Sequence, residues 1–153
     1  MSGSYPPTHD RVNRPLAMLA NPSLDDIKRL LRDSSSIAVV GCSPKPYRPS
    51  HEIADFLIDQ GYEMIPVNPG HSSLLDRPCY PRVSAIPQPV DIVNVFRRSE
   101  FVAPVVDDAI AAHAKAIWLQ DGIRDDTAAQ RARAAGLIVV QDRCIMRDHL
   151  TLL

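Results

Sequence analysis

Short runs of consecutive hydrophobic residues recur along the chain, and several are separated by segments whose hydrophobic residues follow a helical period. The predicted strands are residues 36–40, 63–67, 91–96, 116–120 and 137–141, and the first of them is the run with continuous apolar character. A run that is hydrophobic throughout is typical of a strand buried on both faces, as in a parallel sheet. Because strands alternate with helical segments, the pattern predicts right-handed crossovers and one parallel sheet.

Four segments have the period of an amphipathic helix. Ser23 follows a proline and is expected to cap the first helix, and Ser50 is expected to cap the second. The third helix is expected to open at Ser99 or at Pro104, and the fourth covers residues 125–135. Every predicted helix therefore has an identifiable start.

The pattern predicts an α/β protein: a single Rossmann-like domain over residues 15–153, with a mostly parallel sheet of five or six strands and helices on both faces. The proline-rich residues 74–89 supply at most one short edge strand, near Tyr80. Residues 1–14 lack periodicity and are expected to form a flexible N-terminal tail. A Rossmann-like strand order is favoured, with the flavodoxin-like order as the alternative. Either order places a ligand outside the carboxyl ends of the strands.

Composition narrows the function classes. The 153 residues carry a formal net charge of −1, which gives no chain-wide attraction to nucleic acid or to an anionic membrane. No hydrophobic run approaches the length of about 18 residues that indicates a membrane span. The three cysteines form no C-x-x-C pair, which argues against a disulfide framework and a cysteine zinc site. We expect a cytoplasmic protein without a metal site; no protein partner is indicated.

The loop after the first hydrophobic run carries residues that suit a phosphate group. The next helix begins there, and a helix N-terminus offers free N–H groups and a partial positive charge. Gly41 allows a tight turn, and Arg48 can grip two phosphate oxygens at once. Further hydroxyl donors and a further cation come from Ser43, Ser50 and Lys45. Cys42 lies in the same loop.

The loop after the second run argues against a nicotinamide dinucleotide. In a dinucleotide-binding site this position normally carries an acidic residue for the ribose hydroxyl, and here it is Asn68. The first loop also has one glycine where the G-x-G-x-x-G fingerprint has three. A nicotinamide-dependent oxidoreductase is therefore the least favoured function.

The third run ends in Phe96, Arg97 and Arg98. Consecutive side chains at a strand end point to opposite sides, so one arginine is expected to face the crevice and the other solvent or a carboxylate. Phe96 can wall a planar group.

These loops belong to an ordered set of segments: residues 37–44, 48–51, 65–69, 80–81, 90–99, 118–122 and 142–144. In that order they resemble the small CoA-binding proteins related to the N-terminal domain of the succinyl-CoA synthetase α subunit, over roughly residues 24–149. The resemblance implies a Rossmann-like fold that binds coenzyme A or an acyl-CoA. It implies that the phosphates are surrounded by Gly41, Ser43, Arg48 and Ser50.

The resemblance also implies roles for the later loops. The adenosine side would be lined by Val67, Asn68 and Pro69, and the nucleotide or the pantetheine entrance would be flanked by Phe96, Arg97 and Arg98. Gln120 and Cys144 lie in the corresponding end-of-strand loops. The synthetases carry a second domain with a phosphorylated histidine, for which these residues have no room. We therefore expect binding without catalysis and no catalytic residue.

An enzyme acting on an acyl-CoA is the alternative, and His51 and Cys144 are the nearby candidates for its chemistry. Neither has an evident partner in the sequence of the kind found in catalytic triads. Cys42 and Cys144 both follow strands directly, so either thiol can lie where the coenzyme thiol would enter.

Overall fold

The computed structural model describes residues 20–153, so the expected tail over residues 1–14 lies outside the described residues. The helices are α2 (Leu24–Asp33), α3 (Pro49–Asp59), α4 (Val102–Ala111), α5 (Asp126–Ala134) and α6 (Ile145–Leu152). The main sheet contains β1 (Ser36–Val40), β2 (Glu63–Val67), β5 (Ile92–Val95), β6 (Ala116–Leu119) and β7 (Ile138–Val140). Shorter elements are the hairpin strands β3 (Ser73–Leu74) and β4 (Arg77–Pro78) and the 3-10 turns η2 (Val83–Ala85) and η3 (Ser99–Phe101).

The five strands of the main sheet are parallel and lie in the order β2-β1-β5-β6-β7. Tyr80 forms a single parallel bridge with Val67 on the other edge of β2. This bridge occupies the place of the third strand in the Rossmann order, so the expected edge strand is reduced to one residue. Pro66 O accepts a hydrogen bond from Tyr80 N on this edge, where the donor that proline lacks is dispensable.

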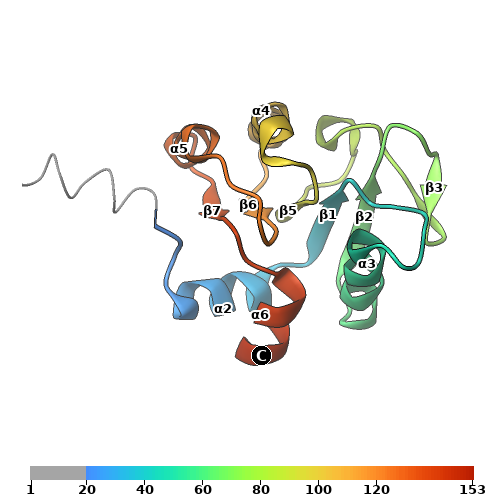
Figure 1. Ribbon diagram of the computed structural model, residues 1–153, viewed down its shortest axis with the longest axis horizontal. Helices are drawn as coiled ribbons and strands as arrows, with labels where there is room; N and C mark the ends of the chain where they lie inside the picture. The colour runs from blue at the N-terminus through green and yellow to red at the C-terminus, as the bar shows by residue number, and fades with distance from the viewer. Residues whose placement is uncertain (1–19) are drawn as a thin grey trace, which may run out of the picture.

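Helices cover both faces of the sheet, as the sequence predicts (Figure 1). One hydrophobic cluster joins alternate strand residues to α4 and α5, through Val106 and Ala129 among others. The other joins the opposite residues to α2, α3 and α6, through Leu31, Leu57 and Ile145 among others. This three-layer arrangement confirms the predicted fold class, and it leaves the strand ends free for a site.

Helix starts match the sequence less closely than strands do. Ser23 caps α2 by accepting a hydrogen bond from Asp26 N, as expected. The prediction for Ser50 is wrong, because Arg48 occupies the cap position and Ser50 lies inside the first turn of α3. α4 begins at Val102, after the turn η3, rather than at either expected residue. α6 was not predicted at all. Within residues 20–153, no helix is long and apolar enough to cross a membrane.

Candidate functional site

Three adjoining hollows form a groove across the carboxyl ends of β2, β1, β5 and β6. The β2 hollow, of about 300 Å³, lies between the end of β2 and α4. The β1 hollow, of about 340 Å³, lies at the start of α3. The β6 hollow, of about 550 Å³, lies beyond the ends of β5 and β6. Gly41 lines the first two hollows, Phe96 lines the last two, and Arg97 joins the β2 hollow to the β6 hollow.

The loop from β1 to α3 is held in shape by its own serines. The Ser50 hydroxyl, which is buried, accepts a hydrogen bond from Ser43 N at 3.0 Å. The Ser43 hydroxyl accepts from Lys45 N at 3.1 Å, and Ser43 O contacts His51 Nδ1 at 2.8 Å. Both serines line the β1 hollow. Both hydroxyl oxygens already accept hydrogen bonds from backbone N–H groups of the loop. The two serines therefore fix the loop backbone around the β1 hollow.

Gly41 is required where β1 meets β5. Its φ is +85°, and a Cβ atom there would lie 2.9 Å from the carbonyl oxygen of Phe96. The backbones approach this closely because Phe96 N donates to Val40 O while Gly41 N donates to Val67 O. A side chain would push the β5 loop outward and open the groove.

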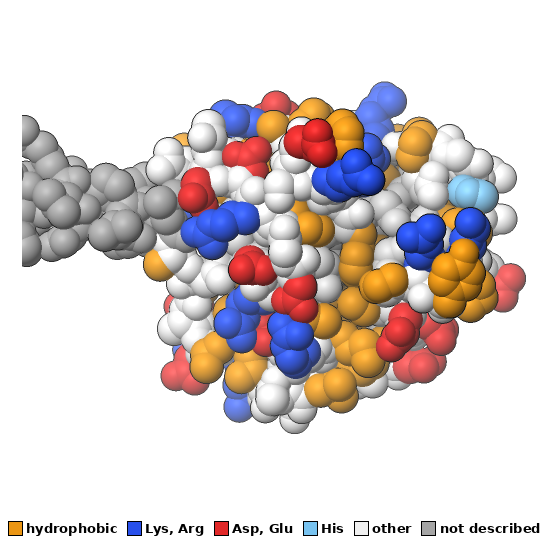
Figure 2. All heavy atoms as spheres, viewed as in Figure 1, with side chains coloured by type: hydrophobic (Ala, Val, Ile, Leu, Met, Phe, Trp, Pro, Cys, Tyr) orange, Lys and Arg blue, Asp and Glu red, His pale blue; other side chains and the backbone are white. Residues whose placement is uncertain are grey.

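Five basic side chains line the groove, and within residues 20–153 none of them forms an ion pair with a carboxylate. They are Lys45 and Arg48 in the β1 hollow, Arg82 in the β2 hollow, Arg98 in the β6 hollow, and Arg97 in both the β2 and β6 hollows. The Arg48 guanidinium lies 5.7 Å from the centre of the Tyr47 ring, and that of Arg97 lies 5.3 Å from the centre of the Phe101 ring. Figure 2 shows basic side chains beside exposed hydrophobic ones on the side of the molecule where the loop from β1 to α3 runs.

Both arginines that follow β5 line the groove, but they differ in burial. Arg97 is half-buried and lines two hollows, whereas Arg98 is exposed and lines one. The expectation that one arginine faces the groove and the other faces solvent stays a prediction.

The β2 hollow is mostly apolar. Val67 and Pro69 line it together with Val83 and Val105. Asn68 is not among its lining residues, because its amide connects two loops. Asn68 Nδ2 donates to Cys42 O at 2.9 Å, and its Oδ1 accepts from Gly70 N at 2.8 Å. Asn68 therefore holds the loop after β1 against the loop after β2, and its side chain does not itself line the β2 hollow.

The β6 hollow combines apolar walls with a thiol and an amide. Phe96, Ile53 and Ile123 line it together with Gln120 and Cys144. Gln120 Oε1 accepts a hydrogen bond from Ile145 N at 3.0 Å, which fixes the start of α6 against the end of β6. Cys144 occupies the cap position of α6.

The cysteines of the groove loops differ sharply in accessibility. Cys42 is completely buried in the core, and burial, followed by the neighbouring Cys79 thiol, raises the pKa of its thiol to about 12. Cys79 is also buried, whereas Cys144 is partly exposed. Cys42 can therefore offer only backbone atoms to a ligand.

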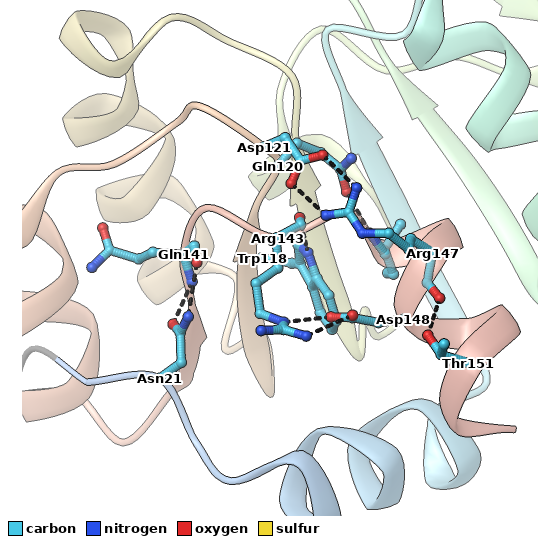
Figure 3. A network of polar contacts seen from close by, with 10 residues as sticks. Asn21, Trp118, Gln120, Asp121, Gln141, Arg143, Arg147, Asp148 and Thr151 are labelled. Carbon is cyan, nitrogen blue, oxygen red and sulfur yellow. Dashed lines mark hydrogen bonds and ion pairs between the residues drawn. The ribbon is translucent and has the colours of Figure 1, made fainter.

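A polar network behind the β6 hollow holds α6 in place (Figure 3). Trp118 Nε1 donates to Arg143 O at 2.8 Å, and the Arg143 guanidinium makes two hydrogen bonds to the buried Asp148. Arg147 makes two further bonds to Asp121 at the end of β6. The sequence pattern did not predict this helix, although the spacing of Ile145 and His149 around Asp148 is compatible with one.

The chain matches the family described as the CoA binding domain over residues 35–149, and it belongs to that family. It is 40% identical over 131 residues to an uncharacterized Bacillus subtilis protein, YneT, covering 86% of this chain and 97% of that protein. A hypothetical protein from Pyrococcus horikoshii is similar in structure, with a TM-score of 0.83 and 37% identity, covering 86% of this chain and 92% of that one.

A dinucleotide-forming acetyl-coenzyme A synthetase from Candidatus Korarchaeum cryptofilum, solved with phosphate and ADP, also contains a similar part. It has a TM-score of 0.63 and 30% identity, and the match covers 69% of this chain and 25% of the synthetase. The fold thus occurs alone and as one part of a larger enzyme. Both findings confirm the resemblance drawn from the sequence.

Proposed function

We propose that this protein is a binding module for coenzyme A or an acyl-CoA, with the ligand lying along all three hollows. The adenosine lies in the apolar β2 hollow, beside Val67 and Pro69. The phosphates lie at the β1 hollow, and the pantetheine chain extends over Phe96 into the β6 hollow. The observation that carries the proposal is the row of basic side chains without carboxylate partners along this groove.

Charge supports a ligand of this kind. Coenzyme A has a pyrophosphate and a 3′-phosphate, which together carry about four negative charges at pH 7. Five cations that have no carboxylate partner among residues 20–153 line the groove of a chain whose formal net charge is −1. Leaving cations unpaired gives no stability to the free protein, whereas a polyanion provides each with a partner. Lys45 and Arg48 lie nearest the α3 N-terminus, which adds a partial positive charge.

The same geometry disfavours the two alternative functions. A nicotinamide dinucleotide would need a carboxylate at the end of β2, and Asn68 there is occupied in holding Cys42 O. An acyl-CoA enzyme would need an activated acid, base or nucleophile. His51 Nδ1 is engaged with the carbonyl oxygen of Ser43, so this nitrogen acts in shaping the loop. We therefore assign the chain a binding role, in a reducing cytoplasm that suits its three free cysteines.

Titration calorimetry with coenzyme A, dephospho-CoA and NAD tests this assignment. Coenzyme A is expected to bind most tightly, because it alone of the three carries the 3′-phosphate. NAD is expected to bind weakly or undetectably. Affinity is expected to fall as salt is raised, since the cations lie at an open site. Tighter binding of NAD than of coenzyme A, or steady turnover of an acyl-CoA by the purified chain, would refute the proposal.

A further inference from the structure

We propose that Cys144 is a site of covalent modification, at which the thiol of coenzyme A is captured as a mixed disulfide. This inference rests on the proposed function, because it needs the pantetheine chain in the β6 hollow. It adds a reaction to what would otherwise be reversible binding, and it gives the protein a way to register oxidation of the coenzyme.

Accessibility selects Cys144 from the three cysteines. Cys42 is fully buried and Cys79 nearly so, and neither lines any of the three hollows. Cys144 is partly exposed and lines the β6 hollow, and it does not line the β1 hollow. A ligand held by its phosphates at the β1 hollow therefore extends its thiol end toward Cys144.

A buried amide in the same hollow independently indicates a polar ligand there. Gln120 is only 4% exposed and lines the hollow, and its Oε1 is committed to Ile145 N. Its Nε2 group has no hydrogen-bond acceptor within residues 20–153, and it is not among the fully enclosed atoms that lack a partner, so it is accessible from the hollow. An amide donor that faces a hollow is available to a ligand that supplies an acceptor. The pantetheine chain contains two amide carbonyls, which are acceptors of the kind that Gln120 lacks.

The surroundings of Cys144 favour thiol chemistry. It lies at the cap position of α6, at the surface of the β6 hollow. Arg97 and Arg98 line the same hollow without carboxylate partners. These cations favour a polyanionic disulfide over a neutral one.

The reaction needs a disulfide as its oxidant, and we assign that role to oxidised coenzyme A. The Cys144 thiolate attacks one sulfur of the coenzyme disulfide, forming a new S–S bond as the original S–S bond breaks. The second coenzyme A molecule leaves as a thiolate and takes up a proton. The products are the Cys144 mixed disulfide and one reduced coenzyme A, so atoms and electrons balance.

The test is to incubate the full-length, fully reduced protein with oxidised coenzyme A and to follow modification by intact mass and peptide mapping. One adduct is expected, on Cys144, forming about tenfold faster or more than with glutathione disulfide at equal concentration, because the groove holds the reagent in place. An excess of S-methyl-CoA, which cannot exchange, is expected to slow the reaction. Cys144→Ser is expected to abolish the adduct, and Cys79→Ser to leave its rate unchanged.

Calorimetry with reduced coenzyme A on the wild-type protein separates this inference from the proposed function. Binding without any Cys144 adduct, or with an adduct on Cys79 alone, would overturn the capture site and leave the binding module intact. Equal rates with both disulfides would show simple exposure of the thiol and would also overturn it. Absence of coenzyme A binding would overturn the proposed function itself, and the capture proposal with it.

Discussion

The two ends of the parallel sheet both carry hollows, and they differ in how their polar groups are used. The hollow at the amino end is the larger, at about 590 Å³ against about 550 Å³ for the β6 hollow. Its charges are largely paired, however. Asp26 forms an ion pair with Arg29, Asp33 forms one with Arg32, and Arg133 donates to Ala20 O.

The amino end is also tied together by its own hydrogen bonds. Asp91 Oδ2 accepts from the backbone N–H groups of Ser35 and Ser36 at 2.7 and 3.2 Å. The Ser36 hydroxyl in turn donates to Pro89 O and accepts from Asp91 N. These bonds join β1 to the segment that precedes β5, so the donors and acceptors here stabilise the fold.

The carboxyl end leaves comparable groups without partners. Within residues 20–153, its five cations form no ion pair with a carboxylate, and Gln120 Nε2 has no hydrogen-bond acceptor. The volume of a hollow is therefore a poor guide to a site. A cluster of charges without partners is the better guide, because folding alone gives no reason to retain it.

The largest expected effect concerns the close approach at Gly41. Gly41→Ala is expected to lower the free energy of unfolding by about 2–4 kcal/mol, from the left-handed backbone and the clash with Phe96 O. Gly136→Ala is the matched control, because φ is +94° there and no atom lies within 4 Å of the added Cβ. Gly136→Ala is expected to lose only the part of the free energy of unfolding that comes from the left-handed backbone conformation. Equal losses in urea denaturation would show that the β1–β5 contact tolerates a side chain.

The next effect compares basic residues from the two ends. Arg48→Ala is expected to weaken coenzyme A binding tenfold or more, since one charge-assisted phosphate contact contributes about 1.5–3 kcal/mol. Arg29→Ala, at the amino end, removes a cation that is already paired with Asp26 and is expected to leave the affinity unchanged. If calorimetry shows the same affinity for both variants, the β1 hollow is not the phosphate site.

A smaller effect of opposite sign is expected for buried amides. Asn94→Leu replaces an unpartnered, fully buried amide by an apolar group with the same number of heavy atoms. It is expected to raise the free energy of unfolding by about 1–2 kcal/mol. Gln141 is equally buried, but it bonds Asp125 N and Asp126 Oδ1. Gln141→Met is therefore expected to lower the free energy of unfolding. If thermal or urea unfolding showed a lower stability for both variants, the idea that the Asn94 amide is unsatisfied would be contradicted.

The smallest effect is a pH dependence near the amino end. Burial lowers the pKa of His149, whose ring packs edge-on against Phe56 and Tyr62. The unfolded state then binds the proton more readily, so stability is expected to fall as pH drops below about 6.5. His149→Gln is expected to flatten this slope in unfolding measured from pH 7.5 to 5. His71→Gln, at an exposed site, is expected to keep it.

Much of the fold follows from the local sequence, because strands buried on both faces are recognisable by their hydrophobic residues. The predicted strands over residues 36–40 and 63–67 coincide with β1 and β2. Both are hydrophobic because they pack on two faces, and this pattern needs no partner to be recognised. The groove loops were also predictable in position, since parallel strands bring their carboxyl ends to one edge.

The roles of individual side chains were less predictable. Ser50 has a residue type that caps helices, but in the structure it bonds Ser43 N, seven positions away along the loop. α6 is short, and contacts with Trp118 and Gln120 hold it, so its own hydrophobic pattern is a weak signal.

The sequence by itself therefore determined the layers, the direction of the strands and the edge at which a ligand would lie, because hydrophobic periodicity and short connections encode them. Only the tertiary structure decided which groups are free to act. Asn68 is occupied by Cys42 O, and Gln120 is half occupied by Ile145 N. Cys42 is buried while Cys144 reaches the groove. Such differences arise from contacts between residues distant in the chain, which depend on strand register and helix packing rather than on local residue type.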